Sequence, residues 1–155
     1  MTIKNALVVL FAGTSLALSA VSVAGVDTET DKNSVILAGH DAVAYFTENT
    51  AIEGSSGYTA VHDGAIYYFK NAENRDTFNA DPGKYAPQYG GYCALGAALG
   101  KKFDIDGKAF EVVDGKLFVN KNQDVFETWS EDKADNIKRA NKNWPKIADI
   151  AAADL

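Results

Sequence analysis

The stretch YTAVHDGAIYYF, residues 58–69, decides the fold of this 155-residue chain. Two segments rich in β-branched and aromatic residues, 58–62 and 65–69, flank the dipeptide Asp63-Gly64. Asp-Gly tolerates the positive φ angles that a two-residue hairpin turn requires, so the pattern predicts an antiparallel hairpin. The same signal returns at 109–120, where Asp114-Gly115 separates two further strand-like segments.

Helical segments follow each hairpin. Asn71 is placed to cap a helix that runs to about Ala80, and a short helix is expected from about 93 to 100. Two more helices are expected after the second hairpin, the first starting at Asn122 and the second covering 131–144. The order hairpin, helices, hairpin, helices predicts an α+β fold of small antiparallel hairpins packed with short helices. Because the segments after the two hairpins differ in sequence, we do not interpret the hairpins as a repeat.

The N-terminus has the pattern of an export signal. Residues 6–23 are apolar or small, and Ser22-Val23-Ala24 supplies the small residues at −3 and −1 that a signal peptidase needs. A retained transmembrane anchor is the alternative, but serines and glycine interrupt the run and no basic cluster follows it. We therefore predict a signal peptide over 1–24, a flexible leader over 25–34 and a single domain over 35–155. The protein is expected to be exported, either periplasmic or secreted.

Charge and cysteine content narrow the classes of partner. The chain has 15 basic and 21 acidic residues, a net charge of −6, and one cysteine. An acidic surface repels nucleic-acid phosphates and anionic lipid headgroups, so we expect no nucleic acid and, after signal cleavage, no membrane as a partner. A metal ion or small ligand is compatible with this charge. A single cysteine cannot form an internal disulfide, and the sequence indicates no oligomeric state.

Three stretches resemble the YHS domain family. They are DAVAYF (41–46), YYF (67–69) at the end of the first hairpin, and RDTFNADPGKY (75–85), and the resemblance covers about residues 35–100. Downstream, 113–120 and Asn143-Trp144-Pro145 resemble the extension of exported, single-domain members of the family. The resemblance implies a fold similar to the TRASH metal-binding domains and a metal-associated function, with copper or zinc as the metal.

The sequence departs from the metal-binding version of this family. That version carries cysteines in D-P-V-C and F-C-S-x-x-C patterns, whereas Ala44, Lys70 and Asn74 occupy those positions here. An alanine offers no lone pair, and a lysine brings positive charge to where a cation would bind. The chain therefore resembles a cysteine-poor branch of the family.

A different metal site could use the remaining soft or borderline ligands, which are Cys93, His40 and His62. Two imidazoles and a thiolate suit copper or zinc if the fold brings them together. Their spacing forms no motif, so other interpretations stay open. His62 could be a solvated hairpin residue. Cys93 could be a buried apolar side chain, a redox or intermolecular disulfide thiol, or a nucleophile.

All seven tyrosines lie between Tyr45 and Tyr92. They could contribute core area, or they could line a cleft for a small ligand. For the second case we expect a wall formed by Tyr45, Tyr89, Gly90, Gly91 and Tyr92. The function predicted from the sequence is an exported, metal-associated binding module handling copper or zinc. The alternative is a module for a small non-metal ligand or a protein partner, and a binder is expected rather than an enzyme.

Overall fold

The computed structural model describes residues 27–155, so the predicted signal peptide lies outside the described residues. The first half of the described chain contains a short turn, two strands and three helices: η1 (Leu37–Gly39), α1 (Ala44–Thr47), β1 (Ser55–His62), β2 (Ala65–Phe69), α2 (Ala72–Ala80) and α3 (Pro82–Tyr85). The second half contains η2 (Gln88–Gly91), α4 (Ala94–Ala98), β3 (Asp106–Val113), β4 (Lys116–Asn120), α5 (Gln123–Glu131) and α6 (Lys133–Ile147), and η3 (Ala152–Asp154) ends the chain. β1 pairs with β2 and β3 with β4, both antiparallel, which confirms the predicted α+β fold. Among the described residues, no helix has the length and apolar character needed to span a membrane.

Local sequence signals place both hairpins and the helices after them. Asp63 and Asp114 each have a φ of 49°, and the glycine after each has a φ of 79° or 72°, as the tight turn requires. In each half, one residue separates the second strand of the hairpin from an asparagine that caps the next helix. The Asn71 side chain accepts a hydrogen bond from the amide of Asn74 at 2.8 Å, and Asn122 accepts one from Val125 at 2.9 Å.

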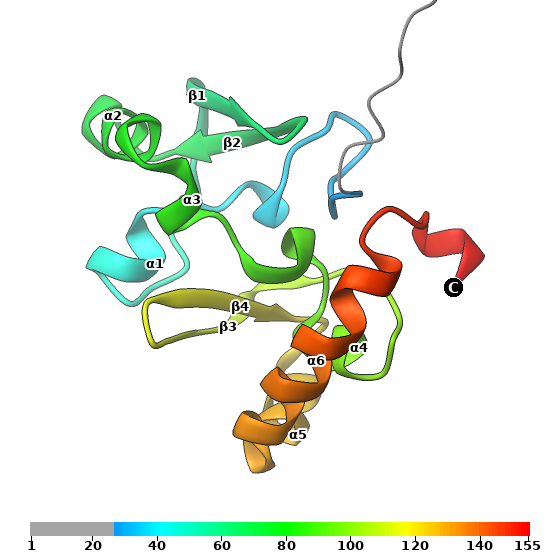
Figure 1. The fold of residues 1–155 in the computed structure, drawn as a ribbon. Helices are drawn as coiled ribbons and strands as arrows, with labels where there is room; N and C mark the ends of the chain where they lie inside the picture. Colours follow the sequence, from blue (N-terminus) through cyan, green and yellow to red (C-terminus); the bar gives the residue numbers. More distant parts are fainter. Residues whose placement is uncertain (1–26) are drawn as a thin grey trace, which may run out of the picture.

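The two halves repeat each other in three dimensions, with equivalent positions 51 or 52 residues apart. Both run turn, helix, strand, strand, helix, helix (Figure 1). A parallel bridge joins Val35 to Ile66 in the first half, and the equivalent bridge joins Pro87 to Leu117 in the second. Our expectation that the hairpins do not form a repeat is therefore wrong. Both halves keep the parallel bridge, the positive-φ Asp-Gly turn and the asparagine cap, while many of the side chains between them differ.

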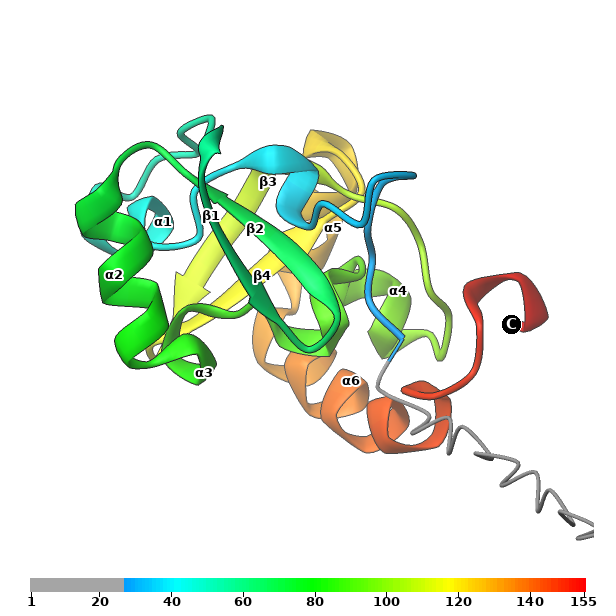
Figure 2. The ribbon, with the colours of Figure 1, turned by 90° about the horizontal axis from the view of Figure 1, so that it is seen from above.

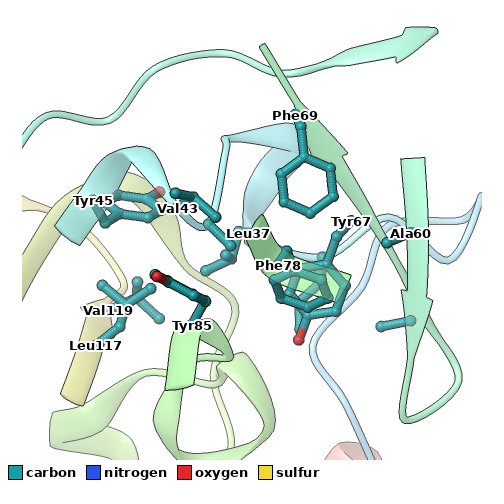
Figure 3. Close-up of a cluster of buried hydrophobic side chains, with 13 residues drawn as sticks. Leu37, Val43, Tyr45, Ala60, Tyr67, Phe69, Phe78, Tyr85, Leu117 and Val119 are labelled. Atoms are coloured by element: carbon teal, nitrogen blue, oxygen red, sulfur yellow. The ribbon is translucent and has the colours of Figure 1, made fainter. Parts of the chain in front are cut away.

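The two hairpins share a core, and the turns η1 and η2 lie between them (Figure 1). Seen from above, β1–β2 crosses over β3–β4 (Figure 2). Aromatic side chains of the first half, including Tyr67, Phe69 and Phe78, form one cluster that also contains Leu117 and Val119 from β4 (Figure 3). A second cluster, around Trp129 and Phe118, packs under α4 and α6. Neither hairpin could bury its apolar face without its neighbours.

The segment before the first turn is packed against the rest of the protein. The Asp27 amide donates to the Ala148 carbonyl and the Glu29 amide to the Gly90 carbonyl, both at 2.9 Å. Thr30 bridges to Ile36. The described part of the predicted leader, residues 27–34, thus differs from the flexible segment that we expected, because its polar groups find partners within the fold.

Candidate functional site

A cleft of about 320 Å³ lies where the β1–β2 turn, η2 and the C-terminal part of α6 meet. Its volume is at the lower end of the range for small-molecule pockets. We call it the aromatic cleft because three aromatic rings, from Tyr67, Tyr89 and Trp144, contribute to its lining. The complete lining consists of Thr28, Ile36, Asp63, Tyr67, Ala86, Pro87, Gln88, Tyr89, Gly90, Asn141, Trp144 and Pro145.

Tyr89 is held in the cleft wall in an unusual backbone conformation. Its φ is 56°, and the two glycines that follow have φ values of 60° and 84°. A non-glycine residue in this left-handed region costs roughly 1–2 kcal/mol. The Tyr89 hydroxyl donates a hydrogen bond to Asn141 Oδ1 at 3.0 Å, and its ring packs 5.9 Å from that of Trp144. Burial raises the pKa of Tyr89 to about 12, so the hydroxyl keeps its proton at neutral pH.

The two glycines of this turn are required by close packing within the protein. A Cβ atom on Gly90 would lie 2.6 Å from the Asp27 carbonyl oxygen, and one on Gly91 would lie 3.1 Å from Ile36 Cδ1. Gly90 contributes to the cleft lining, whereas Gly91 packs behind it. Gly90 therefore lets the N-terminal segment approach the wall, and Gly91 leaves room for the Ile36 side chain.

A buried lysine fixes this wall from behind. The Lys102 side chain is 0% exposed, and its Nζ donates to Asp27 Oδ2 at 3.1 Å. Two backbone carbonyls complete its partners, Ala148 at 3.1 Å and Ile150 at 2.5 Å. Each of the three ammonium N–H groups thus has a hydrogen-bond acceptor, which offsets the cost of burying the charge.

Tyr92 and Trp144 enclose the same ammonium group. Their ring centroids lie 5.0 and 5.2 Å from Lys102 Nζ, a cation–π arrangement. The Tyr92 hydroxyl donates to Asp27 Oδ2 at 2.8 Å. Because this hydroxyl is used internally, Tyr92 supports the wall and does not itself line the cleft.

Tyr45, the remaining predicted wall residue, lies in the core of the first half. It is 1% exposed, donates to the Gly107 carbonyl at 2.7 Å and packs edge-on against Phe110. Of the five residues predicted as a ligand wall, the structure places Tyr89 and Gly90 in the cleft lining and Gly91 and Tyr92 behind it.

The two histidines predicted as metal ligands have separate surroundings. His40 is buried, with Nδ1 3.0 Å from the Leu37 carbonyl, and its Nε2 has no hydrogen-bond partner. A Cβ on Gly107 would lie 2.4 Å from His40 Nδ1, so β3 packs directly on the ring. His62 lies beside the first hairpin turn, 3.3 Å from Asp63 Oδ2, with its side chain 28% exposed.

Cys93 is fully buried, and its Sγ lies 3.6 Å from Asn120 Oδ1. Burial raises the pKa of its thiol. Within residues 27–155, no three His, Cys, Asp or Glu side chains form a group that could hold a metal ion. The fold does not assemble Cys93, His40 and His62 into one site there.

The positions where the YHS resemblance would place metal ligands are occupied by a different network. The Ala44 and Lys70 amides and the Asn74 side-chain amide all donate to the carboxylate of Asp41, at 3.2, 2.9 and 2.8 Å. Lys70 Nζ pairs with Glu48. These residues do not fit a metal ion, because the groups present are hydrogen-bond donors: the N–H groups share the Asp41 carboxylate, and the Lys70 ammonium pairs with Glu48.

Sequence reasoning missed the contribution of α6 to the cleft. Asn141 and Trp144 are three residues apart and therefore lie on one face of the helix. That spacing was visible in the sequence, but nothing in the sequence indicated that this face meets Tyr89. Asp63 was expected only as a turn residue, although it also lines the cleft.

No protein-family model, curated protein or solved structure matches this chain. The kinship with YHS domains stays a prediction from the sequence stretches quoted above.

Proposed function

We propose that this protein is a small-ligand-binding module whose aromatic cleft receives an organic cation. The observation that carries the proposal is the composition of the lining, in which the rings of Tyr67, Tyr89 and Trp144 accompany a single charged residue, Asp63. The negative faces of aromatic rings attract cations, and quaternary ammonium groups are recognised in this way. A carboxylate at the same cleft favours the same sign of charge.

The other polar side chains of the cleft lining carry no charge, so they are suited to orienting a bound ligand by hydrogen bonds. Gln88 and Thr28 line the cleft, and Asn141 already accepts the Tyr89 hydroxyl. The net charge of −6 adds a long-range field that attracts cations. The predicted signal peptide and the YHS resemblance extend the proposal to an exported module that keeps a YHS-like fold without the metal chemistry of the family.

Calorimetric titration of the processed protein, purified from an exporting host, tests the proposal. The probes are tetramethylammonium and choline as cations, indole as a neutral aromatic molecule and benzoate as an anion. We expect the cations to bind more tightly than indole and benzoate not to bind.

Asp63→Asn is the diagnostic variant, because asparagine also tolerates the positive φ at this position. We expect it to weaken cation binding by about threefold, as for a partly exposed charge pair. The matched control is Asp114→Asn, at the equivalent turn of the second hairpin, where binding should be unchanged. Absence of cation binding, or equal effects of the two substitutions, would refute the proposal. Tight stoichiometric binding of Cu(II) or Zn(II) in a parallel titration would favour the metal-associated function.

A further inference from the structure

A second pocket lies between α4, the segment that follows it and the first turn of α5. Its volume is about 250 Å³, and its lining consists of Cys93, Leu95, Gly96, Leu99, Phe103, Lys121 and Val125. It shares no lining residue with the aromatic cleft, so the inference drawn from it does not depend on the function proposed above. Leu99 and Phe103 are 59% and 40% exposed, which leaves apolar surface at this pocket accessible to a ligand.

The internal repeat gives every residue of this pocket a counterpart in the first half. Cys93 corresponds to Asp41, because each directly follows a left-handed turn. The Asp41 amide donates to the Ile52 carbonyl at 2.8 Å, and the Cys93 amide donates to the Phe103 carbonyl at 3.1 Å. In the order of the lining given above, the counterparts are Asp41, Val43, Ala44, Thr47, Ile52, Lys70 and Asn74.

In the first half, polar side chains connect these positions. Asp41 is 0% exposed, and its Oδ2 accepts from Asn74 Nδ2 at 2.8 Å and from the Lys70 amide at 2.9 Å. The ammonium group of Lys70 pairs with Glu48, the residue directly after α1. The side chains thus satisfy one another, and the lysine has a carboxylate partner from the same half.

The second half has apolar or weakly polar side chains where this network stands. Passing from the first half to the second, Cys93 replaces Asp41, Leu99 replaces Thr47 and Val125 replaces Asn74. A thiol is a weak hydrogen-bonding group, and the leucine and valine side chains form no hydrogen bonds. The network is therefore absent, and the apolar pocket lies in its place.

The lysine is kept in the second half, but its carboxylate partner is not. Lys121 corresponds to Lys70, whereas the counterpart of Glu48 is Gly100, which has no side chain. The position that supplies the anion in the first half is therefore empty of any charged group in the second. A carboxylate brought by a ligand would restore the pair.

The surroundings of Lys121 leave room for such a carboxylate. Its ammonium group lies 5.5 Å from the centroid of the Phe103 ring, a pocket residue, and 3.2 Å from Asp104 Oδ1. The Asp104 side chain is 75% exposed, so this pair is held in solvent. An ammonium group has three donors, so a second carboxylate can bind beside the first or displace it.

We propose that this pocket binds the anion of an alkyl carboxylic acid, with the alkyl chain in the apolar part of the lining and the carboxylate at the Lys121 ammonium group. The carboxylate takes the part that Glu48 has in the first half, and the alkyl chain occupies the place of the polar network. A flexible chain can bend from the lysine into the pocket. A rigid ring attached directly to its carboxylate, as in benzoate, cannot adjust in this way.

Calorimetric titration of the processed protein with hexanoate, heptanoate and octanoate tests the proposal. We expect the affinity to rise about fourfold for each added CH₂ group, because each one leaves water for the pocket. Acetate should not bind detectably, and the neutral analogue octanamide should bind more weakly than octanoate. An affinity that does not depend on chain length, or octanamide binding as tightly as octanoate, would overturn the proposal.

Substitutions of the two charged groups locate the site. Lys121→Gln should weaken octanoate binding about threefold and leave octanamide binding unchanged. Asp104→Asn removes the competing carboxylate and should strengthen octanoate binding about threefold. The matched control is Lys116→Gln, at an exposed position of β4, where binding should be unchanged. Equal effects of the two lysine substitutions would overturn the proposal.

Val125→Trp tests the pocket itself, because the larger side chain fills the space that the alkyl chain would occupy. We expect octanoate binding to be lost, and a thermal melt checks that the variant is folded. Octanoate binding that persists in the folded variant would show that the chain binds elsewhere. The substitutions of Lys121 and Asp104 lie at exposed positions, so they test the site even if Val125→Trp does not fold.

Discussion

The surroundings of Asp41 and Cys93 show how two copies of one backbone arrangement can serve different purposes. In the first half, four hydrogen bonds to the buried carboxylate join α1, the end of β2 and the start of α2. In the second half, the thiol makes weaker contacts, and a pocket opens beside it. The first copy is a structural connection, whereas in the second the Leu95 amide donates to Asn120 Oδ1 at 3.2 Å and a pocket lies beside the sulfur.

The two left-handed turns also differ in what covers them. β3 packs against the first turn, because Gly107 approaches His40 and Leu37. The N-terminal segment covers the second, where the Asp27 carbonyl approaches Gly90. A strand of the opposite half thus closes one turn, and the polar segment held by Lys102 closes the other.

Removing the two counterpart side chains should have unequal effects. Asp41→Ala leaves three backbone donors and the Asn74 amide without their acceptor, so we expect a loss of roughly 4 kcal/mol in the free energy of unfolding. Cys93→Ala removes one small buried atom and should cost about 1 kcal/mol. Urea denaturation of both variants measures the difference. Equal losses would mean that the carboxylate does not hold the first half together as described.

Replacing Lys102, the buried lysine that holds the N-terminal segment over the second turn, should lower the free energy of unfolding nearly as much. Lys102→Met keeps much of the side-chain volume but leaves Asp27 and two buried carbonyls without their donor, so we expect a loss of about 3 kcal/mol. Lys101→Met, at an exposed neighbouring position, should cost less than about 0.5 kcal/mol. Urea denaturation again gives the values. Similar results for the two lysines would contradict the buried network.

The helix caps after the two hairpins should respond alike. Asn71 and Asn122 make the same bond to the amide three residues later, so replacing either by alanine should cost about 1 kcal/mol. Thermal melts of the two variants, compared with the wild type, test this equivalence. A loss at one cap alone would show that the repeat does not extend to the helix starts.

The last expected effect concerns the dependence of stability on pH and the segment over the second turn. Burial, together with the nearby carboxylates Asp104 and Asp31, raises the pKa of Glu29 from 4.5 to about 7. Between these two values the folded protein keeps a proton that the unfolded chain loses, so this group makes stability fall as pH rises from about 4.5 to 7.

Glu29→Gln should remove that slope and raise the stability above pH 7, which Tm measurements across this pH range would show. Glu127→Gln, at an exposed glutamate of α5, serves as the control and should leave the slope in place. A Glu29→Gln variant that keeps the wild-type slope would exclude Glu29 as its origin.

The sequence by itself determined the local elements of this protein. The Asp-Gly pairs at 63–64 and 114–115 and the capping asparagines act through their own φ angles and through bonds to residues three positions away. Their effect is therefore visible in a short window, and it was sufficient to predict both hairpins and the α+β class. Tyr89 and Gly90 could be nominated as ligand contacts because the local concentration of tyrosine and glycine is unusual.

Only the tertiary structure decided which of these residues meet. Asn141 joins Tyr89 across 52 positions, and Lys102 reaches Asp27 across 75. Such contacts depend on how the two halves pack. The spacing of residues along the chain therefore does not show which of them come close in space. For the same reason Cys93, His40 and His62 could be grouped by chemistry although the fold separates them. The repeat was hidden because hydrogen bonds between backbone atoms persist while the side chains around them change.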